Sequence, residues 1–173
     1  DGTTTNRSSP GTTAGSSTTW KQVTGGIGYS AAGIKTDGTL WTWGGGGGLG
    51  SIGDGGSSNR SSPGTTAGGG TNWKEVAAGT HVAAIKTDGT LWTWGYNAQG
   101  QLGTGDTTAR SSPGTTAGGG TNWKQISCGE YNTAAIKSDG TLWTCGYNTG
   151  GALGDSTTTN RSSFITTSGG GTT

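Results

Sequence analysis

The phrase Ile85-Lys-Thr-Asp-Gly-Thr-Leu-Trp-Thr-Trp94 decides the fold, because the chain contains three copies of it, the third with Ser138 and Cys145 in place of Thr and Trp. The first copy runs from Ile34 to Trp43 and the third from Ile136 to Cys145, so neighbouring copies begin 51 residues apart (34, 85 and 136). A second phrase, Arg-Ser-Ser-Pro-Gly-Thr-Thr-Ala-Gly, begins at positions 7, 60 and 110 and returns in altered form at 161. A period of this length is typical of repeat proteins, in which each repeat is one supersecondary unit.

The composition predicts an all-β chain. Forty glycines in 173 residues, with much Thr and Ser and no Met, leave no stretch with helical periodicity. Ten Lys and Arg stand against nine Asp and Glu, so we expect no basic surface of the kind that nucleic acid binding needs, and no nucleic-acid partner. No apolar run approaches the roughly 20 residues that span a bilayer, so we expect no membrane span.

The second repeat predicts four consecutive strands. They are expected at residues 73–78, 82–87, 91–94 and 111–117. Asp88-Gly89 lies between the second and third strands and predicts a type I′ hairpin turn, which needs positive φ at both central residues. Pro113 fits only an edge strand or a strand end, because proline has no N–H to donate. Four antiparallel strands with an edge proline make one blade of a β-propeller.

The third strand of each repeat is bulky on both faces. Leu91 and Thr93 point to one face, and Trp92 and Trp94 point to the other. In a propeller each blade is packed between two others, which would bury both faces. We therefore interpret the Trp pairs at 41/43 and 92/94 as packing between blades and not as a ligand platform.

Four segments together resemble the regulator of chromosome condensation repeat. They are Val76-Ala-Ala-Gly-Thr-His81, residues 83–89, residues 91–97 and Gly100-Gln-Leu-Gly-Thr-Gly105. The resemblance implies a closed propeller of four-stranded blades, usually seven, of which this chain would hold about three. Members of that family range from a nucleotide exchange factor to a secreted inhibitor of β-lactamases, so their functions are carried by faces and loops.

We divide the chain by its repeats. Residues 1–19 are expected to be the outer strand of a preceding blade with a linker, and 20–72, 73–122 and 123–173 to be blades 1, 2 and 3. Three blades would leave two open edges, which invite pairing with another chain. We therefore expect the partners to include either further blades of a longer protein or identical copies of this chain.

Catalytic chemistry is not indicated, because it needs convergent ionisable groups and this chain has one His, two Cys and isolated acids. We expect no enzyme, no cofactor and no metal. His81 is interpreted as a turn residue equivalent to Tyr29 and Asn132. The long loops contain three aspartates without the closely alternating oxygen donors of a calcium loop. These are Asp54, Asp106 and Asp155.

Cys128 and Cys145 occur only in the third repeat. They end the first and third strands of one blade, so their Cα atoms should lie about 10 Å apart, beyond disulfide reach. We favour two free thiols, and a locally distorted bridge is the alternative. Asn6, Asn59 and Asn160 each begin Asn-Arg-Ser, which is an acceptor pattern for glycosylation in a secreted eukaryotic protein.

Two functions are compatible with this pattern. The first is a non-enzymatic display or adhesion module of an extracellular or virion assembly, which the low charge and near-identical repeats favour. The alternative is a soluble propeller that binds a protein or glycan through its variable loops. The candidate binding residues for the alternative are Tyr29, His81, Glu130 and Tyr131.

Overall fold

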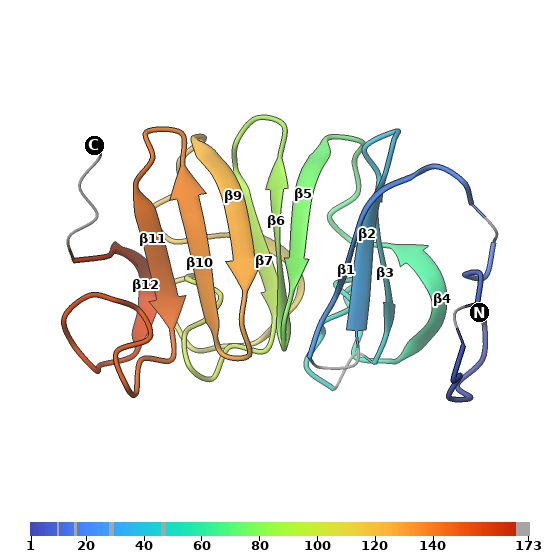
Figure 1. Ribbon diagram of the computed structural model, residues 1–173, viewed down its shortest axis with the longest axis horizontal. Helices are drawn as coiled ribbons and strands as arrows, with labels where there is room; N and C mark the ends of the chain where they lie inside the picture. The colour runs from blue at the N-terminus through green and yellow to red at the C-terminus, as the bar shows by residue number, and fades with distance from the viewer. Residues whose placement is uncertain (10, 16, 28–29, 46–47, 169–173) are drawn as a thin grey trace.

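The computed structural model describes residues 1–9, 11–15, 17–27, 30–45 and 48–168. These residues form twelve β-strands and no helix, which confirms the all-β prediction. Three antiparallel sheets of four strands each make three blades. Figure 1 shows them side by side in chain order along the long axis, with blades 1 and 3 at opposite ends.

Each blade repeats one set of strands. Blade 1 contains β1 (Trp20–Gly25), β2 (Ser30–Lys35), β3 (Leu40–Gly44) and β4 (Arg60–Thr65). Blade 2 contains β5 (Trp73–Ala78), β6 (His81–Lys86), β7 (Leu91–Gly95) and β8 (Arg110–Thr115). Blade 3 contains β9 (Trp123–Cys128), β10 (Asn132–Lys137), β11 (Leu142–Gly146) and β12 (Arg161–Thr166).

Strands that follow one another in the chain pair within each blade. In blade 2, β6 pairs with both β5 and β7, and β8, which pairs with β7, is one of the two edge strands. Pro113 lies in this edge strand, as predicted. The second strand starts one residue earlier than expected, at His81, and the outer strand covers Arg110–Thr115 instead of 111–117.

The hairpin between β6 and β7 is not the predicted type I′ turn. Gly89 has a positive φ of 80°, whereas Asp88 does not have a positive φ. The Gly89 N–H donates to Lys86 O at 2.9 Å and the Lys86 N–H donates to Thr90 O at 3.0 Å. These bonds are those of a type I turn followed by a glycine bulge, which needs only one left-handed residue. The prediction of two left-handed residues was therefore wrong.

The core lies between blades. Trp94, fully buried, packs with Trp73 and Val76 of blade 2 against Ile34 and Leu40 of blade 1. A second apolar cluster joins blades 2 and 3 in the same way. Burying an apolar side chain of this size contributes about 1.5–3 kcal/mol, so the blade interfaces supply much of the stability. Inter-blade packing of Trp94 is thus confirmed.

The N-terminal segment lies beside blade 1. Its described residues before Trp20 form no strand, so the proposed outer strand within residues 1–19 stays a prediction. The Gly2 N–H donates to Ser61 O of β4 at 3.2 Å. The described part of the chain has no helix that is long and apolar enough to cross a bilayer.

Cys128 and Cys145 are free thiols, as the sequence favours. Both pair with Thr133, one on each side of the central strand β10. Burial raises the pKa of the Cys128 thiol to about 12 and raises that of Cys145 as well. Both side chains are therefore protonated at neutral pH and act as small apolar groups.

Candidate functional site

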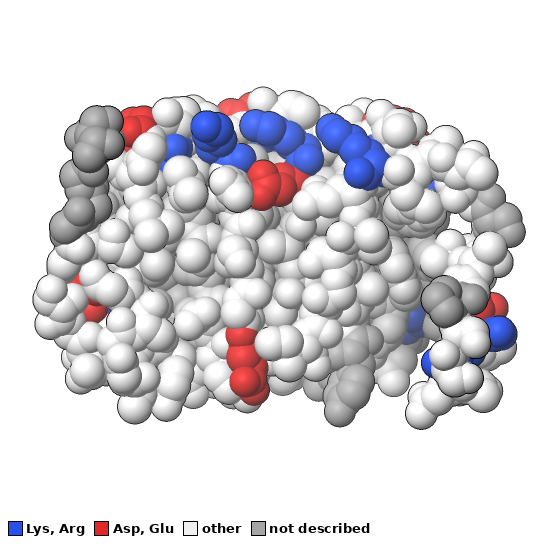
Figure 2. All heavy atoms as spheres, in the orientation of Figure 1, with Lys and Arg blue, Asp and Glu red and all other residues white. Residues whose placement is uncertain are grey.

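The hairpin ends of the blades carry a lysine clamped between two tryptophans. In blade 2, Lys86 Nζ lies 4.1 Å from the Trp92 ring centroid and 4.7 Å from that of Trp73. Blades 1 and 3 repeat this arrangement with Lys35 and Lys137. Figure 2 shows positively charged side chains gathered along this upper edge of the molecule, whereas the arginines of the outer strands pair at the opposite ends of the blades. The three clamped ammonium groups interact with the chain's own rings, which stabilises the hairpin end of each blade.

The opposite ends of blades 2 and 3 carry three tyrosines in contact. The ring centroids of Tyr96 and Tyr131 lie 5.9 Å apart and those of Tyr131 and Tyr147 lie 6.3 Å apart, both pairs edge to face. The Tyr147 N–H donates to Tyr131 O at 2.8 Å. Tyr147 is 37% exposed and the other two rings are half-buried. These three residues and the adjacent Glu130 are called the tyrosine cluster below.

Glu130 gives the tyrosine cluster a negative charge. Its side chain is exposed. Its hydrogen bond with the phenol, and then its charge, raise the pKa of Tyr131 above the ordinary value. The Tyr131 hydroxyl therefore stays protonated at neutral pH. Thr80 of blade 2 donates its hydroxyl to the Glu130 carbonyl oxygen, which fixes this loop of blade 3 against blade 2.

The loops that present Tyr96 and Tyr147 are held from inside by the asparagine that follows each tyrosine. The buried Asn97 amide donates to Thr108 O at 3.0 Å, and its Oδ1 accepts from the Leu102 N–H at 2.9 Å. Asn148 repeats both kinds of bond in blade 3. Blade 1 has Gly45 at the position of Tyr96. The tyrosine cluster is therefore specific to blades 2 and 3.

His81 lies beneath this surface and not on it. It is fully buried, and its Nε2 lies 2.6 Å from the Thr133 hydroxyl of blade 3. Burial lowers its pKa from 6.5 to about 4, so the imidazole is neutral at pH 7. Because His81 pairs with Gly95 as Ser30 pairs with Gly44, its equivalent in blade 1 is Ser30, and the proposed equivalence with Tyr29 was wrong. Tyr29 itself lies outside the described residues.

The structure thus brings two of the four predicted binding residues, Glu130 and Tyr131, to one exposed surface. Sequence reasoning missed Tyr96 and Tyr147. The signal was present as Gly-Tyr-Asn, which follows the third strand in both repeats, at 95–97 and 146–148. Nothing in the sequence shows that Tyr131 lies between the two, because that depends on contacts between blades.

The loop aspartates are engaged in ion pairs. Asp54, Asp106 and Asp155 contact Arg60, Arg110 and Arg161 at 2.8, 2.8 and 2.7 Å respectively. Hydrogen bonds, chiefly from the Thr157 hydroxyl, hold the pKa of Asp155 well below its usual range. Among the described residues no three His, Cys, Asp or Glu side chains are grouped closely enough to hold a metal ion.

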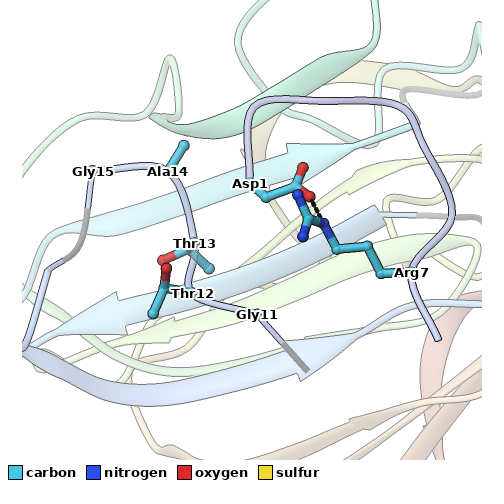
Figure 3. Close-up of a pocket in the computed structure, with 7 residues that line it drawn as sticks. All are labelled: Asp1, Arg7, Gly11, Thr12, Thr13, Ala14 and Gly15. Carbon is cyan, nitrogen blue, oxygen red and sulfur yellow. Dashed lines mark hydrogen bonds and ion pairs between the residues drawn. The ribbon is translucent and has the colours of Figure 1, made fainter. Parts of the chain in front are cut away.

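A surface hollow of about 400 Å³ lies within the N-terminal segment (Figure 3). Its ionisable residues, Asp1 and Arg7, are paired with each other. The remaining lining residues are small or weakly polar: Gly11, Thr12, Thr13, Ala14 and Gly15. This hollow therefore offers no convergent groups for chemistry.

Family models and solved structures match this chain. The Regulator of chromosome condensation (RCC1) repeat matches residues 88–136, and a second model of the same description matches residues 73–101 and 123–152. No curated protein matches the chain in sequence.

Three solved structures share the fold of this chain. Human WBSCR16 has a TM-score of 0.71 at 22% identity, over 86% of this chain and 39% of its own. Prp20p from Saccharomyces cerevisiae, described with its binding to Gsp1p and histones, has a TM-score of 0.74 at 18% identity, over 86% of this chain and 38% of its own. A second structure, of Kap60 bound to yeast RCC1 (Prp20), has a TM-score of 0.75 at 18% identity, over 86% of this chain and 37% of its own.

The chain therefore spans less than two fifths of these neighbours, and at such identities they establish its fold alone. The repeat matches lie on blades 2 and 3, and blade 1 repeats the same four strands. Blades 2 and 3 are therefore repeats of the regulator of chromosome condensation family, and blade 1 is a further β-propeller blade with the same four strands.

Proposed function

We propose that this chain is a non-enzymatic protein-binding module whose partner docks on the tyrosine cluster. The observation that carries the proposal is the continuous edge-to-face contact of Tyr96, Tyr131 and Tyr147 across two blades, beside the exposed Glu130. Tyrosines held in fixed positions supply a large contact area at low entropic cost, which is why they are enriched in protein interfaces.

The chemistry of the cluster favours a partner that presents an arginine or a lysine. A guanidinium or ammonium group is attracted to the face of a tyrosine ring and forms an ion pair with a carboxylate. Here the Tyr131 ring and the Glu130 carboxylate belong to adjacent residues of one loop. The proteins named with the yeast propeller, namely Gsp1p, histones and Kap60, support a protein as the class of ligand.

Two further proposals concern where the protein acts and which class of ligand it binds. A display or adhesion role in an extracellular or virion assembly is supported only by the low charge and the near-identical repeats. A glycan is the second candidate ligand, because exposed tyrosine rings can stack on a sugar. The experiment below distinguishes the two ligand classes.

The test selects binding peptides from a displayed random library, with the 173-residue chain as the target. The affinities of the selected peptides are then measured for the wild type, Tyr131→Ala and Glu130→Gln. We expect the selected peptides to contain arginine or lysine, and to bind Tyr131→Ala about tenfold or more weakly, as expected for an interface hot spot. Leu49→Ala is the control, because Leu49 is a 41% exposed apolar residue of blade 1. Peptides that bind all variants equally would contradict the proposal, and Tyr131-dependent binding on a glycan array would favour the glycan.

A further inference from the structure

The outer face of blade 3 presents the same apolar side chains that blades 1 and 2 bury against the next blade. Leu142 is 38% exposed, whereas its equivalents Leu40 and Leu91 are both 2% exposed. Ile136 is half-buried, although Ile34 and Ile85 are fully buried. Together with Gln125 and Ala134, Ile136 and Leu142 line a shallow apolar groove.

The opposite outer face, on blade 1, is the complement of this groove. Val23 is 67% exposed, whereas its equivalents Val76 and Ile126 are 2% and 7% exposed. Ile27 on the same blade is 61% exposed. In blades 2 and 3 the residue at the Val23 position packs into the preceding blade. Blade 1 therefore carries an exposed apolar knob, and blade 3 carries an exposed apolar groove.

Polar groups show how such faces join. The Gln22 amide donates to Val76 O at 3.0 Å and accepts from the Val76 N–H at 3.1 Å, across the interface between blades 1 and 2. At the next interface Glu75 accepts from the Ile126 N–H at 2.9 Å. Gln125 is the equivalent of Gln22 and Glu75 on the outer face of blade 3, where it is exposed. It carries the same amide as Gln22 and can make both bonds.

The long loops supply a second inter-blade contact. The Gly55 N–H donates to Ser111 O of the following blade at 2.9 Å, and the Gly105 N–H donates to Ser162 O at 2.7 Å. In blade 3 the residue equivalent to Gly55 is Ser156, which follows Asp155 as Gly55 follows Asp54. Ser156 keeps a left-handed φ of 62°, and among the described residues it is the only non-glycine residue with a positive φ.

We propose that copies of this chain associate head to tail, with the outer face of blade 3 of one copy packed on blade 1 of the next. Gln125 of one copy bonds to the main chain of Val23 of the next, and the Ser156 loop docks on the outer strand β4. The two internal interfaces are the template for this contact. The faces differ from each other, so the contact is heterologous and either closes into a ring or continues as a chain of copies.

The N-terminal segment competes for part of this surface. The Gly2 N–H already contacts Ser61 O of β4, which is the place that the Ser156 loop of the neighbouring copy would take. Asp1 and Arg7 form the same ion pair as Asp155 and Arg161. Association therefore replaces one loop by another of the same chemistry.

The test measures molecular mass by sedimentation equilibrium over a concentration series of the 173-residue chain. We expect multiples of 17.0 kDa for the wild type, and 17.0 kDa alone for Val23→Glu and for Leu142→Glu, because a carboxylate buried without a partner opposes association. Leu49→Glu is the matched control, since it adds a carboxylate at an apolar residue that is 41% exposed and precedes Gly50, which lies against Ser111 of blade 2. It should associate like the wild type.

A mixture of the two variants makes the test specific for the head-to-tail arrangement. Val23→Glu keeps an intact blade 3 face and Leu142→Glu keeps an intact blade 1 face, so an equimolar mixture should form a one-to-one heterodimer that neither variant forms alone. Gln125→Ala should raise the dissociation constant about tenfold without lowering the thermal stability of the monomer. A wild type that stays at 17.0 kDa at all concentrations would overturn the proposal, and so would a Val23→Glu variant that still dimerises.

Discussion

At the scale of single residues, His81 couples the folded state to pH. It is fully buried with a pKa lowered to about 4, against 6.5 for an exposed histidine. Between these values the unfolded chain binds a proton that the folded chain does not. The free energy of unfolding is therefore highest above pH 6.5. It decreases as the pH falls towards 4, by about 3 kcal/mol in total.

This prediction is checked by urea unfolding of the wild type and His81→Asn at pH 7 and pH 4.5. Asparagine is the natural residue at this position in blade 3, as Asn132, and it does not titrate. We expect the wild type to lose at least about 2 kcal/mol more stability than the variant on acidification. Equal losses would show that His81 is not the group that responds.

At the scale of the structural element, the β6–β7 hairpin needs glycine at position 89 for two reasons. Gly89 has a φ of 80°, and a Cβ atom there would lie 2.0 Å from Thr121 O, in the segment that leads into blade 3. The Gly89 carbonyl also accepts from the Trp123 N–H at 3.1 Å. The hairpin tip is thus a contact between blades as well as a turn.

Gly89→Ala should therefore lower the stability of the chain by more than the cost of a left-handed backbone alone. Gly118 is the matched control, because its φ is 84° and a Cβ atom there would meet nothing within 4 Å. Gly118→Ala should cost about 1–2 kcal/mol for the left-handed backbone, and Gly89→Ala at least about 1 kcal/mol more for the lost inter-blade bond. Denaturant unfolding of both variants measures the difference, and equal losses would contradict the second role.

The same hairpin shows how far the sequence could predict the structure. Strand Trp73–Ala78 was predicted with the observed bounds, because the repeats show both its periodicity and its ends. The turn type was not, because Asp-Gly is compatible with more than one hairpin loop. Likewise Tyr131 could be singled out, but its contacts with Tyr96 and Tyr147 depend on how two blades and their loops are placed. The local sequence pattern thus determines the strands, and packing between repeats determines which side chains meet on the surface.

At the scale of the whole molecule, each blade is stabilised mainly by its neighbours. Blade 2 packs on both faces, whereas blades 1 and 3 each pack on one. In such an array stability is a sum of blade terms and interface terms. Blade 2 should therefore open least often in the native state, and blades 1 and 3 more often.

Amide hydrogen exchange followed by mass spectrometry measures this gradient. At low concentration we expect peptides from β5, β6 and β7 to exchange most slowly, and the corresponding strands of blades 1 and 3 to exchange faster, because local opening there breaks a single interface. If copies associate through Val23 and through the groove of Ile136 and Leu142, raising the concentration should slow exchange in β1, β10 and β11 and leave β6 unchanged. Equal protection of all three blades at the lowest concentration would contradict the nearest-neighbour description. A gradient of exchange rates that is the same at every concentration would support the nearest-neighbour description, which holds within one chain. It would contradict association between chains.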